Sequence, residues 1–168
     1  LEEEGLTLIA RRQPVASDLR ATVGMSRVVA ELERAGDEAK KIARTVLGHG
    51  LRPGPATTRD ARHLGQLAVS LLRLSLEAFD RLDSSVATEV IARDHELDAE
   101  YAAGLRRLMT RAMEDPRHVG IALEAAFVLK SLERIGDHAR NLARQVLSIA
   151  GEPRVAEPAP LESDSTPG

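Results

Sequence analysis

One segment occurs twice in this chain, as Leu32-Glu-Arg-Ala-Gly-Asp37 and again as Leu132-Glu-Arg-Ile-Gly-Asp137. Between residues 31–47 and 131–147, ten of seventeen aligned positions are identical, which is more than shared helical composition explains. In each copy a Glu and an Asp lie four residues apart, so two carboxylates are neighbours on one face of a helix. We therefore interpret the chain as a tandem duplication that repeats a pair of carboxylates.

The composition excludes several classes of protein. The 168 residues carry 23 basic and 26 acidic side chains, and only three are aromatic, so binding to nucleic acid is not expected. The absence of Cys excludes disulfides and thiolate ligands, which leaves oxygen and imidazole to bind any metal. Apolar runs are shorter than the roughly 18 residues of a membrane span, so we expect contact with a membrane only through partner complexes.

The spacing of apolar residues predicts an all-α fold, because they recur at three and four and nowhere alternate as in a strand. A first helix should end before Pro14, and the next should start at Ser17 or Asp18 and end near Leu47. Three further helices are expected over residues 58–82, 85–113 and 117–149, which would form a three-helix bundle.

The repeat also divides the chain into parts. We expect a partial first repeat over residues 1–50, a linker over 51–57, a complete second repeat over 58–150 and a disordered tail over 151–168. The second repeat has 75 residues between Thr58 and Glu133, whereas only 32 residues precede Glu33. The first repeat is therefore expected to lack about forty residues, or one and a half helices, at its N-terminus.

Two carboxylates of the second repeat occupy unusual positions. Asp94 and Asp98 fall on the apolar stripe of the helix expected over 85–113, where an unpaired carboxylate is costly. Each must lie at an exposed rim, pair with an arginine or bind a cation. The arginines available for pairing are Arg93, Arg134 and Arg140.

An antiparallel third helix would bring Glu133 and Asp137 to face Asp94 and Asp98. Four carboxylates from two helices suit a hard or borderline cation such as iron, manganese, magnesium or calcium. His138 and Asn141 extend the Glu133 face by one turn, where they would add a ligand or a supporting hydrogen bond, although a lone His on a helix more often does neither.

The first repeat has different residues at some of these positions. Glu38 and Lys41 replace His138 and Asn141, so the two sites are not expected to be equivalent. Gly36 and Gly136 each cost about 1 kcal/mol relative to Ala inside a helix. We interpret both glycines as points where a neighbouring helix approaches closely.

Several motifs together resemble the PhoU family. They are the two Leu-Glu-Arg-x-Gly-Asp segments, Arg12-Gln-Pro-Val-Ala-Ser-Asp-Leu-Arg20 and Val90-Ile-Ala-Arg-Asp-His-Glu-Leu-Asp98, and the resemblance extends over about residues 1–151. It implies tandem three-helix bundles whose paired carboxylates bind metal clusters, with iron as the first choice and zinc, manganese or magnesium as alternatives. The implied ligands are Asp94, Asp98, Glu133 and Asp137 in the second repeat and Glu33 and Asp37 in the first, whose partner motif would lie upstream of Leu1.

The same resemblance implies a cytoplasmic adaptor and not an enzyme. Such a protein links the transporter ATPase PstB to the sensor histidine kinase PhoR and represses the phosphate-starvation response when phosphate is plentiful. A homodimer is expected, because half of the bundle that would cover the apolar face of the first repeat is missing.

Two other functions are alternatives to the adaptor. The first is a carboxylate-bridged di-metal enzyme of the ferritin-like kind, but such enzymes use Glu-x-x-His, and the residue three beyond Glu133 is Gly136. The second is a purely structural helical module in which salt bridges neutralise all the carboxylates.

Overall fold

The computed structural model describes residues 2–48 and 53–151, with side chains described over 21–48 and 53–151. All its elements are helical, which confirms the predicted all-α fold. They are α1 (Glu2–Gly48), α2 (Pro55–Arg81), α3 (Ser84–Glu114), the short 3-10 helix η1 (Pro116–His118) and α4 (Val119–Ala150).

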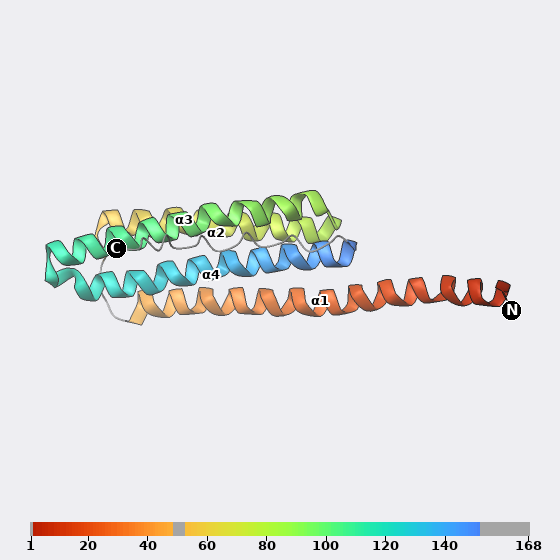
Figure 1. Ribbon diagram of the computed structural model, residues 1–168. Coiled ribbons are helices and arrows are strands. Elements are labelled where there is room, and N and C mark those ends of the chain that lie inside the picture. Colours follow the sequence, from red (N-terminus) through yellow and green to blue (C-terminus); the bar gives the residue numbers. More distant parts are fainter. Residues whose placement is uncertain (1, 49–52, 152–168) are drawn as a thin grey trace, which may run out of the picture.

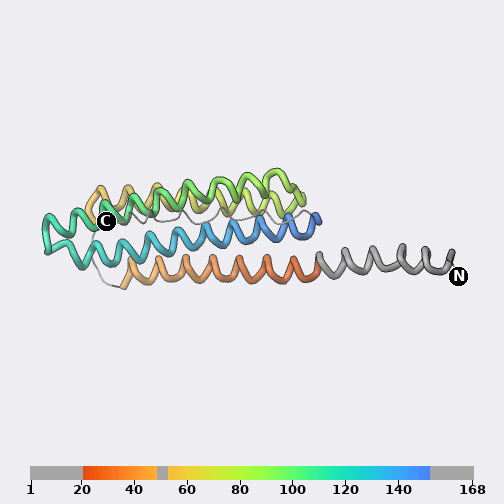
Figure 2. Tube along the Cα trace, in the orientation of Figure 1, coloured from red at the N-terminus to blue at the C-terminus, as the bar shows by residue number. Residues whose placement is uncertain are grey.

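The helices α2, α3 and α4 form the three-helix bundle expected for the second repeat, and α1 lies antiparallel along the outer side of α4 (Figure 1). Helix α4 packs against α1, α2 and α3, whereas α1 packs only against α4 within the described residues. The trace in Figure 2 shows the same arrangement for α1 from residue 21 onward. The core is made of apolar side chains that include Leu64, Leu71, Val90, Leu97, Leu108, Leu129, Leu142 and Val146.

Local hydrogen bonds fix the turns of this bundle. Asp83 caps α3 by accepting from the backbone N–H groups of Ser85 (2.9 Å) and Val86 (3.1 Å). Leu82 closes α2 in the left-handed conformation, with φ of 50°. Helix α2 begins at Pro55, three residues before the expected start, because proline suits the first turn, where no N–H donor is needed. Residues 55–57 of the expected linker therefore belong to α2.

The expected helix break at Pro14 is wrong. Helix α1 is continuous from Glu2 to Gly48, so no new helix starts at Ser17 or Asp18. A proline removes one backbone hydrogen bond, and the rule that a helix ends before proline has exceptions inside long helices. Helix α4 ends at Gly151 in the left-handed conformation, and the rest of the expected tail lies outside the described residues.

The two copies of the repeated segment meet where α1 packs on α4. Glu31 Oε2 lies 2.7 Å from His138 Nδ1. In the other repeat, Ser131 occupies the position of Glu31, and Glu38 occupies the position of His138. Ser131 and Glu38 are also joined by a hydrogen bond. Because residues 31 and 131 correspond, as do 38 and 138, α1 and α4 are related by an approximate two-fold axis.

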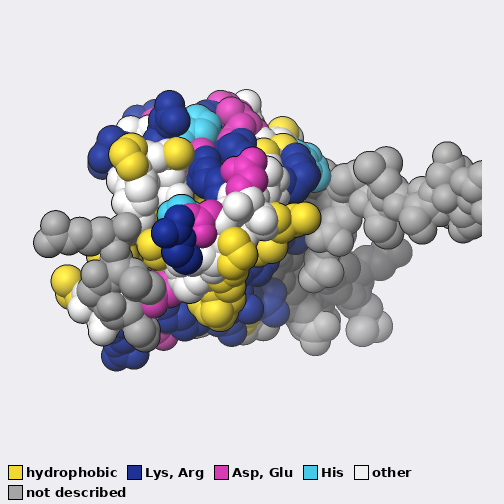
Figure 3. Space-filling model, turned by 90° about the vertical axis from the view of Figure 1, so that its left-hand side faces the viewer, with side chains coloured by type: hydrophobic (Ala, Val, Ile, Leu, Met, Phe, Trp, Pro, Cys, Tyr) yellow, Lys and Arg dark blue, Asp and Glu magenta, His cyan; other side chains and the backbone are white. Residues whose placement is uncertain are grey.

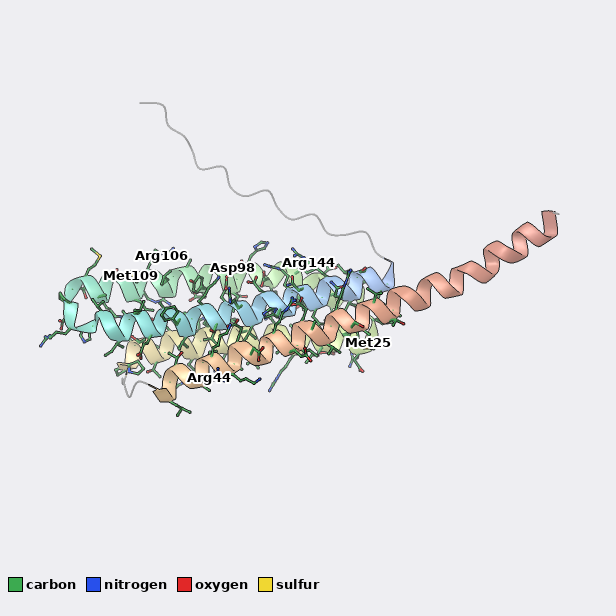
Figure 4. All side chains as sticks on the ribbon, turned by 90° about the horizontal axis from the view of Figure 1, so that it is seen from below. Met25, Arg44, Asp98, Arg106, Met109 and Arg144 are labelled. Atoms are coloured by element: carbon green, nitrogen blue, oxygen red, sulfur yellow. The ribbon has the colours of Figure 1, made fainter. Side chains whose placement is uncertain are left out.

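Helix α1 has one covered face and one open face. Val28 and Ala35 are buried against α4, whereas the apolar residues Ala39 and Val46 are exposed. The open face is defined by Met25, Val29, Leu32, Gly36, Ala39, Ala43 and Val46, of which Leu32 is half-buried and the others are exposed. Figure 4 views the molecule from the α1 side and shows Met25 and Arg44 along this helix.

The open face of α1 has a counterpart on α4. Five of the seven corresponding residues are buried beneath the rest of the second repeat, namely Leu129, Gly136, Ala139, Ala143 and Val146. The other two, Ala125 and Leu132, are half-buried. The same small and apolar pattern is therefore covered by helices in the second repeat and uncovered in the first.

Candidate functional site

Asp94 and Asp137, two of the predicted ligands, are joined by one arginine. Asp94 lies on α3 facing α4, with 1% of its surface exposed. Arg140 Nη1 on α4 donates to Asp94 Oδ2, and Arg140 Nη2 lies 2.7 Å from Asp137 Oδ1. Of Arg93, Arg134 and Arg140, Arg140 is therefore the one that pairs with this site.

The pKa of Asp94 reflects this crowded environment. Burial raises the pKa of its carboxyl, and the charge and hydrogen bond of Arg140 offset only part of that effect. The neighbouring carboxylates of Asp98 and Asp137 raise the pKa of Asp94 further. One guanidinium thus serves three carboxylates, which leaves an excess of negative charge between α3 and α4.

Gly136 lies where α3 and α4 approach each other. A Cβ atom added at Gly136 would collide with the side chain of Leu97 and lie 3.7 Å from Asp94 Oδ1. The predicted close approach is confirmed for this glycine. Asp94 Oδ1 is buried and has no hydrogen-bond partner among the described residues, so the glycine also borders an unsatisfied oxygen.

The other two predicted ligands of the second repeat lie beside this pair. Glu133 is buried and its two carboxylate oxygens lie 2.7 and 2.6 Å from Lys130 Nζ. Lys130 in turn lies over the ring of Tyr101, 5.3 Å from its centroid. Asp98 is half-buried, and its charge acts on both Asp94 and Arg140.

The four predicted ligands of the second repeat are of a type that binds cations, but their present positions do not form a metal site. The oxygen ligands and the unsatisfied Asp94 Oδ1 suit a hard cation. However, no three Asp, Glu or His side chains in the described part of the chain are grouped closely enough to hold a metal. Metal binding by this site stays a prediction, and it requires Arg140 to leave Asp94 and Asp137.

The structure places the first-repeat residues Glu33 and Asp37 on the exposed side of α1. Lys40 Nζ lies 3.0 Å from Asp37 Oδ1, and this hydrogen bond and charge lower the pKa of Asp37. A Cβ at Gly36 would meet nothing within 4 Å, so the predicted close approach is wrong for this glycine. The reason is that Gly36 belongs to the open face.

The expectation that His138 and Asn141 extend the Glu133 face is wrong. Both lie on the side of α4 that packs against α1, where they contact Glu31 Oε2 at 2.7 and 3.4 Å. The sequence reasoning missed Glu31 and Glu38 as covered carboxylates of α1. A signal was available, because both fall on the helix face of Val28 and Ala35 and differ between the repeats.

Acidic and basic side chains are intermixed on the end of the bundle shown in Figure 3, where apolar side chains are also exposed. This end carries a hollow of about 380 Å³ lined by Thr57, Arg111 and His118, among others. Arg111 donates to Thr57 Oγ1 and Asp60 Oδ2, both at 3.2 Å. The arginine of this hollow is therefore already paired within the bundle.

Comparisons with known proteins place this fold. The PhoU domain family model matches residues 1–46 and 61–146. The phosphate-specific transport system accessory protein PhoU homolog of Pseudomonas putida is 43% identical over 152 residues, 89% of this chain and 59% of the relative. The PhoU accessory protein of Escherichia coli K12 is 39% identical over 142 residues, 84% of this chain and 59% of the relative.

A solved structure agrees with these relatives. The crystal structure of PhoU from Pseudomonas aeruginosa matches with a TM-score of 0.75 and 42% identity, covering 89% of this chain and 72% of that one. No helix in the described residues is long and apolar enough to cross a membrane. The chain spans 59% of the length of the Pseudomonas putida and Escherichia coli relatives. Since the family match includes both Leu-Glu-Arg-x-Gly-Asp segments, the chain belongs to the PhoU domain family.

Proposed function

We propose that this chain is a regulatory binding module of phosphate transport and signalling and not an enzyme. The observation that carries the proposal is its match, over both repeats, to proteins named as accessory proteins of a phosphate-specific transport system. The candidate site is consistent with binding, because its carboxylates pair with cationic side chains and provide no nucleophile activated by a neighbouring base.

In its finer form the proposal follows the family resemblance. The chain acts in the cytoplasm as an adaptor between the transporter ATPase PstB and the sensor histidine kinase PhoR. It represses the phosphate-starvation response when phosphate is plentiful, and it reaches the membrane only through these complexes.

Genetics and co-purification test this role. A clean deletion of the gene in its own host should give constitutive expression of phosphate-starvation genes, and the protein should co-purify with PstB and PhoR of the same cell. Normal repression in the deletion strain at high phosphate would contradict the proposal.

The second part of the proposal is metal binding. We propose that Asp94, Asp98, Glu133 and Asp137 hold a cation in the second repeat, and that Glu33 and Asp37 contribute to one in the first, with iron preferred over zinc, manganese or magnesium. The support is the chemistry of the oxygen donors and the unsatisfied Asp94 Oδ1 beside Gly136.

Elemental analysis of anaerobically purified protein tests metal binding. Asp94→Asn and Asp137→Asn should lower the bound metal, whereas Asp80→Asn, at an exposed position of α2, should leave it unchanged. A protein without metal, whose stability does not change with a chelator, would contradict this part alone.

We also propose that the chain forms a homodimer through the open face of α1. The support is the counterpart of this face on α4, which is buried under other helices. In an antiparallel pair of α1 helices, the acidic Glu33 and Asp37 of one copy would approach the basic Lys40 and Arg44 of the other.

A further inference from the structure

Arg140 contacts the very carboxylates that a metal would need. Its guanidinium joins Asp94 of α3 to Asp137 of α4, so it lies between two of the four proposed ligands. A divalent cation at this position would compete for the same oxygens and would repel the guanidinium over a short distance. Arginine and metal therefore cannot both occupy the space between Asp94 and Asp137.

The arginine satisfies this site incompletely. Asp94 Oδ1 and Arg140 Nε are both buried and have no hydrogen-bond partner among the described residues. The single positive charge of Arg140 is shared among Asp94, Asp98 and Asp137. An unpaired buried oxygen and an excess of negative charge both destabilise the site. A cation that contacts this oxygen and adds positive charge would therefore stabilise it.

Arg140 is partly open to solvent. Its side chain is 23% exposed, in contrast to the 1% of Asp94, so it reaches the cluster from the solvent side. An outward rotation of Arg140 would keep its charge in water and would open the oxygens of Asp94 and Asp137. The cost is the loss of an ion pair that links α3 and α4.

The repeat supports the same role for a basic residue at this position. Lys40 corresponds to Arg140 and pairs with Asp37 at the same spacing of three residues. In both copies, therefore, the Asp of the Glu-Arg-x-Gly-Asp segment is neutralised by the basic side chain one turn later. Lys40 is more exposed, at 69%, so its hold on Asp37 is weaker.

We propose that Arg140 is a built-in competitor of the metal and sets the metal affinity of the second-repeat site. The site then has two states, one closed by the arginine and one filled by a cation after the arginine has turned outward. This inference rests on the metal-binding part of the proposed function.

Manganese titration of the purified chain tests the competition, with free Mn²⁺ measured by electron paramagnetic resonance. We expect Arg140→Gln to bind Mn²⁺ about tenfold more tightly than the wild type, which corresponds to about 1.4 kcal/mol. The matched control is Arg93→Gln on α3, whose partner is Glu89 and not the cluster, and its affinity should not change. Equal or weaker binding by Arg140→Gln would overturn the inference.

A second measurement uses the wild type and does not depend on whether a variant folds. If Mn²⁺ displaces the arginine, saturating Mn²⁺ should speed the modification of Arg140 by phenylglyoxal at least severalfold, as mapped by mass spectrometry. An unchanged rate with Mn²⁺ bound would overturn the inference. Failure of wild type and variants alike to bind Mn²⁺ would instead contradict the proposed metal site, and this inference with it.

Discussion

Glu38 links the stability of the α1–α4 contact to pH. Burial raises the pKa of its carboxyl, but hydrogen bonds from Lys41, Ser131 and Arg134 outweigh burial and lower the pKa below its usual 4.5. Because the folded pKa is the lower one, the ionised carboxylate stabilises the fold above about pH 4.5, and this contribution is lost as pH falls through the folded pKa.

We expect Glu38→Gln to lower the free energy of unfolding by about 1–3 kcal/mol at neutral pH, the usual effect of removing hydrogen bonds to a charged group. At acid pH the loss should be smaller, because the contribution of the ionised carboxylate disappears as the pH falls through its lowered folded pKa. Urea unfolding at both pH values measures the difference. Glu33→Gln, at an exposed position of the same helix, is the control, and an equal loss for Glu38→Gln at both pH values would contradict the assignment.

The two repeated glycines provide a matched pair of substitutions. Gly136→Ala should destabilise the fold by about 1–3 kcal/mol, because the new methyl group collides with Leu97. Gly36→Ala meets open space and should stabilise the helix by up to about 1 kcal/mol. Chemical unfolding of the two variants checks this contrast, and effects of the same sign would contradict the difference in packing between the repeats.

At the scale of single residues, part of the candidate site could be predicted from the sequence. Helical periodicity placed Asp94 on a buried face and identified Arg140 among three possible partners. It could not choose among the three, because the direction of each side chain depends on how far α3 and α4 are rotated against each other. His138 was assigned to the wrong face of α4 for the same reason.

At the scale of the elements, several helix ends follow local signals in the sequence. Asp83 caps α3 and Gly151 ends α4, as their residue types favour. Pro14 misled because a proline marks a probable and not a certain helix boundary, and α1 continues through it. The packing of α1 on α4 could not be read from either helix, since each carries more than one apolar face.

The turn between α2 and α3 offers a test of local strain. Leu82 adopts the left-handed conformation, which costs an L-residue about 1–2 kcal/mol and costs glycine almost nothing. We expect Leu82→Gly to raise the free energy of unfolding by about 0.5–1 kcal/mol, measured by calorimetry, because its side chain is exposed. Leu82→Ala keeps the strain and should not stabilise the fold. A gain from alanine that matches the gain from glycine would contradict this explanation.

At the scale of the whole molecule, the open face of α1 predicts self-association. The wild type should be a dimer by light scattering, and Val29→Glu should shift it to a monomer because it buries a charge in the dimer contact. Val69→Glu on α2 is a matched control, since Val29 and Val69 are both 48% exposed. A wild type that is monomeric at all concentrations, or a dimer that tolerates Val29→Glu, would contradict the proposed contact.

The approximate two-fold axis between α1 and α4 has a consequence for how such a chain can diverge. Two identical single-repeat units that met in this way would form an isologous interface, in which every substitution changes both halves of the contact at once. Covalent fusion removes that constraint, because each half can then mutate independently. The two corresponding contacts of this chain have diverged in this way. One pairs the carboxylate of Glu31 with the imidazole of His138, and the other pairs the hydroxyl of Ser131 with the carboxylate of Glu38.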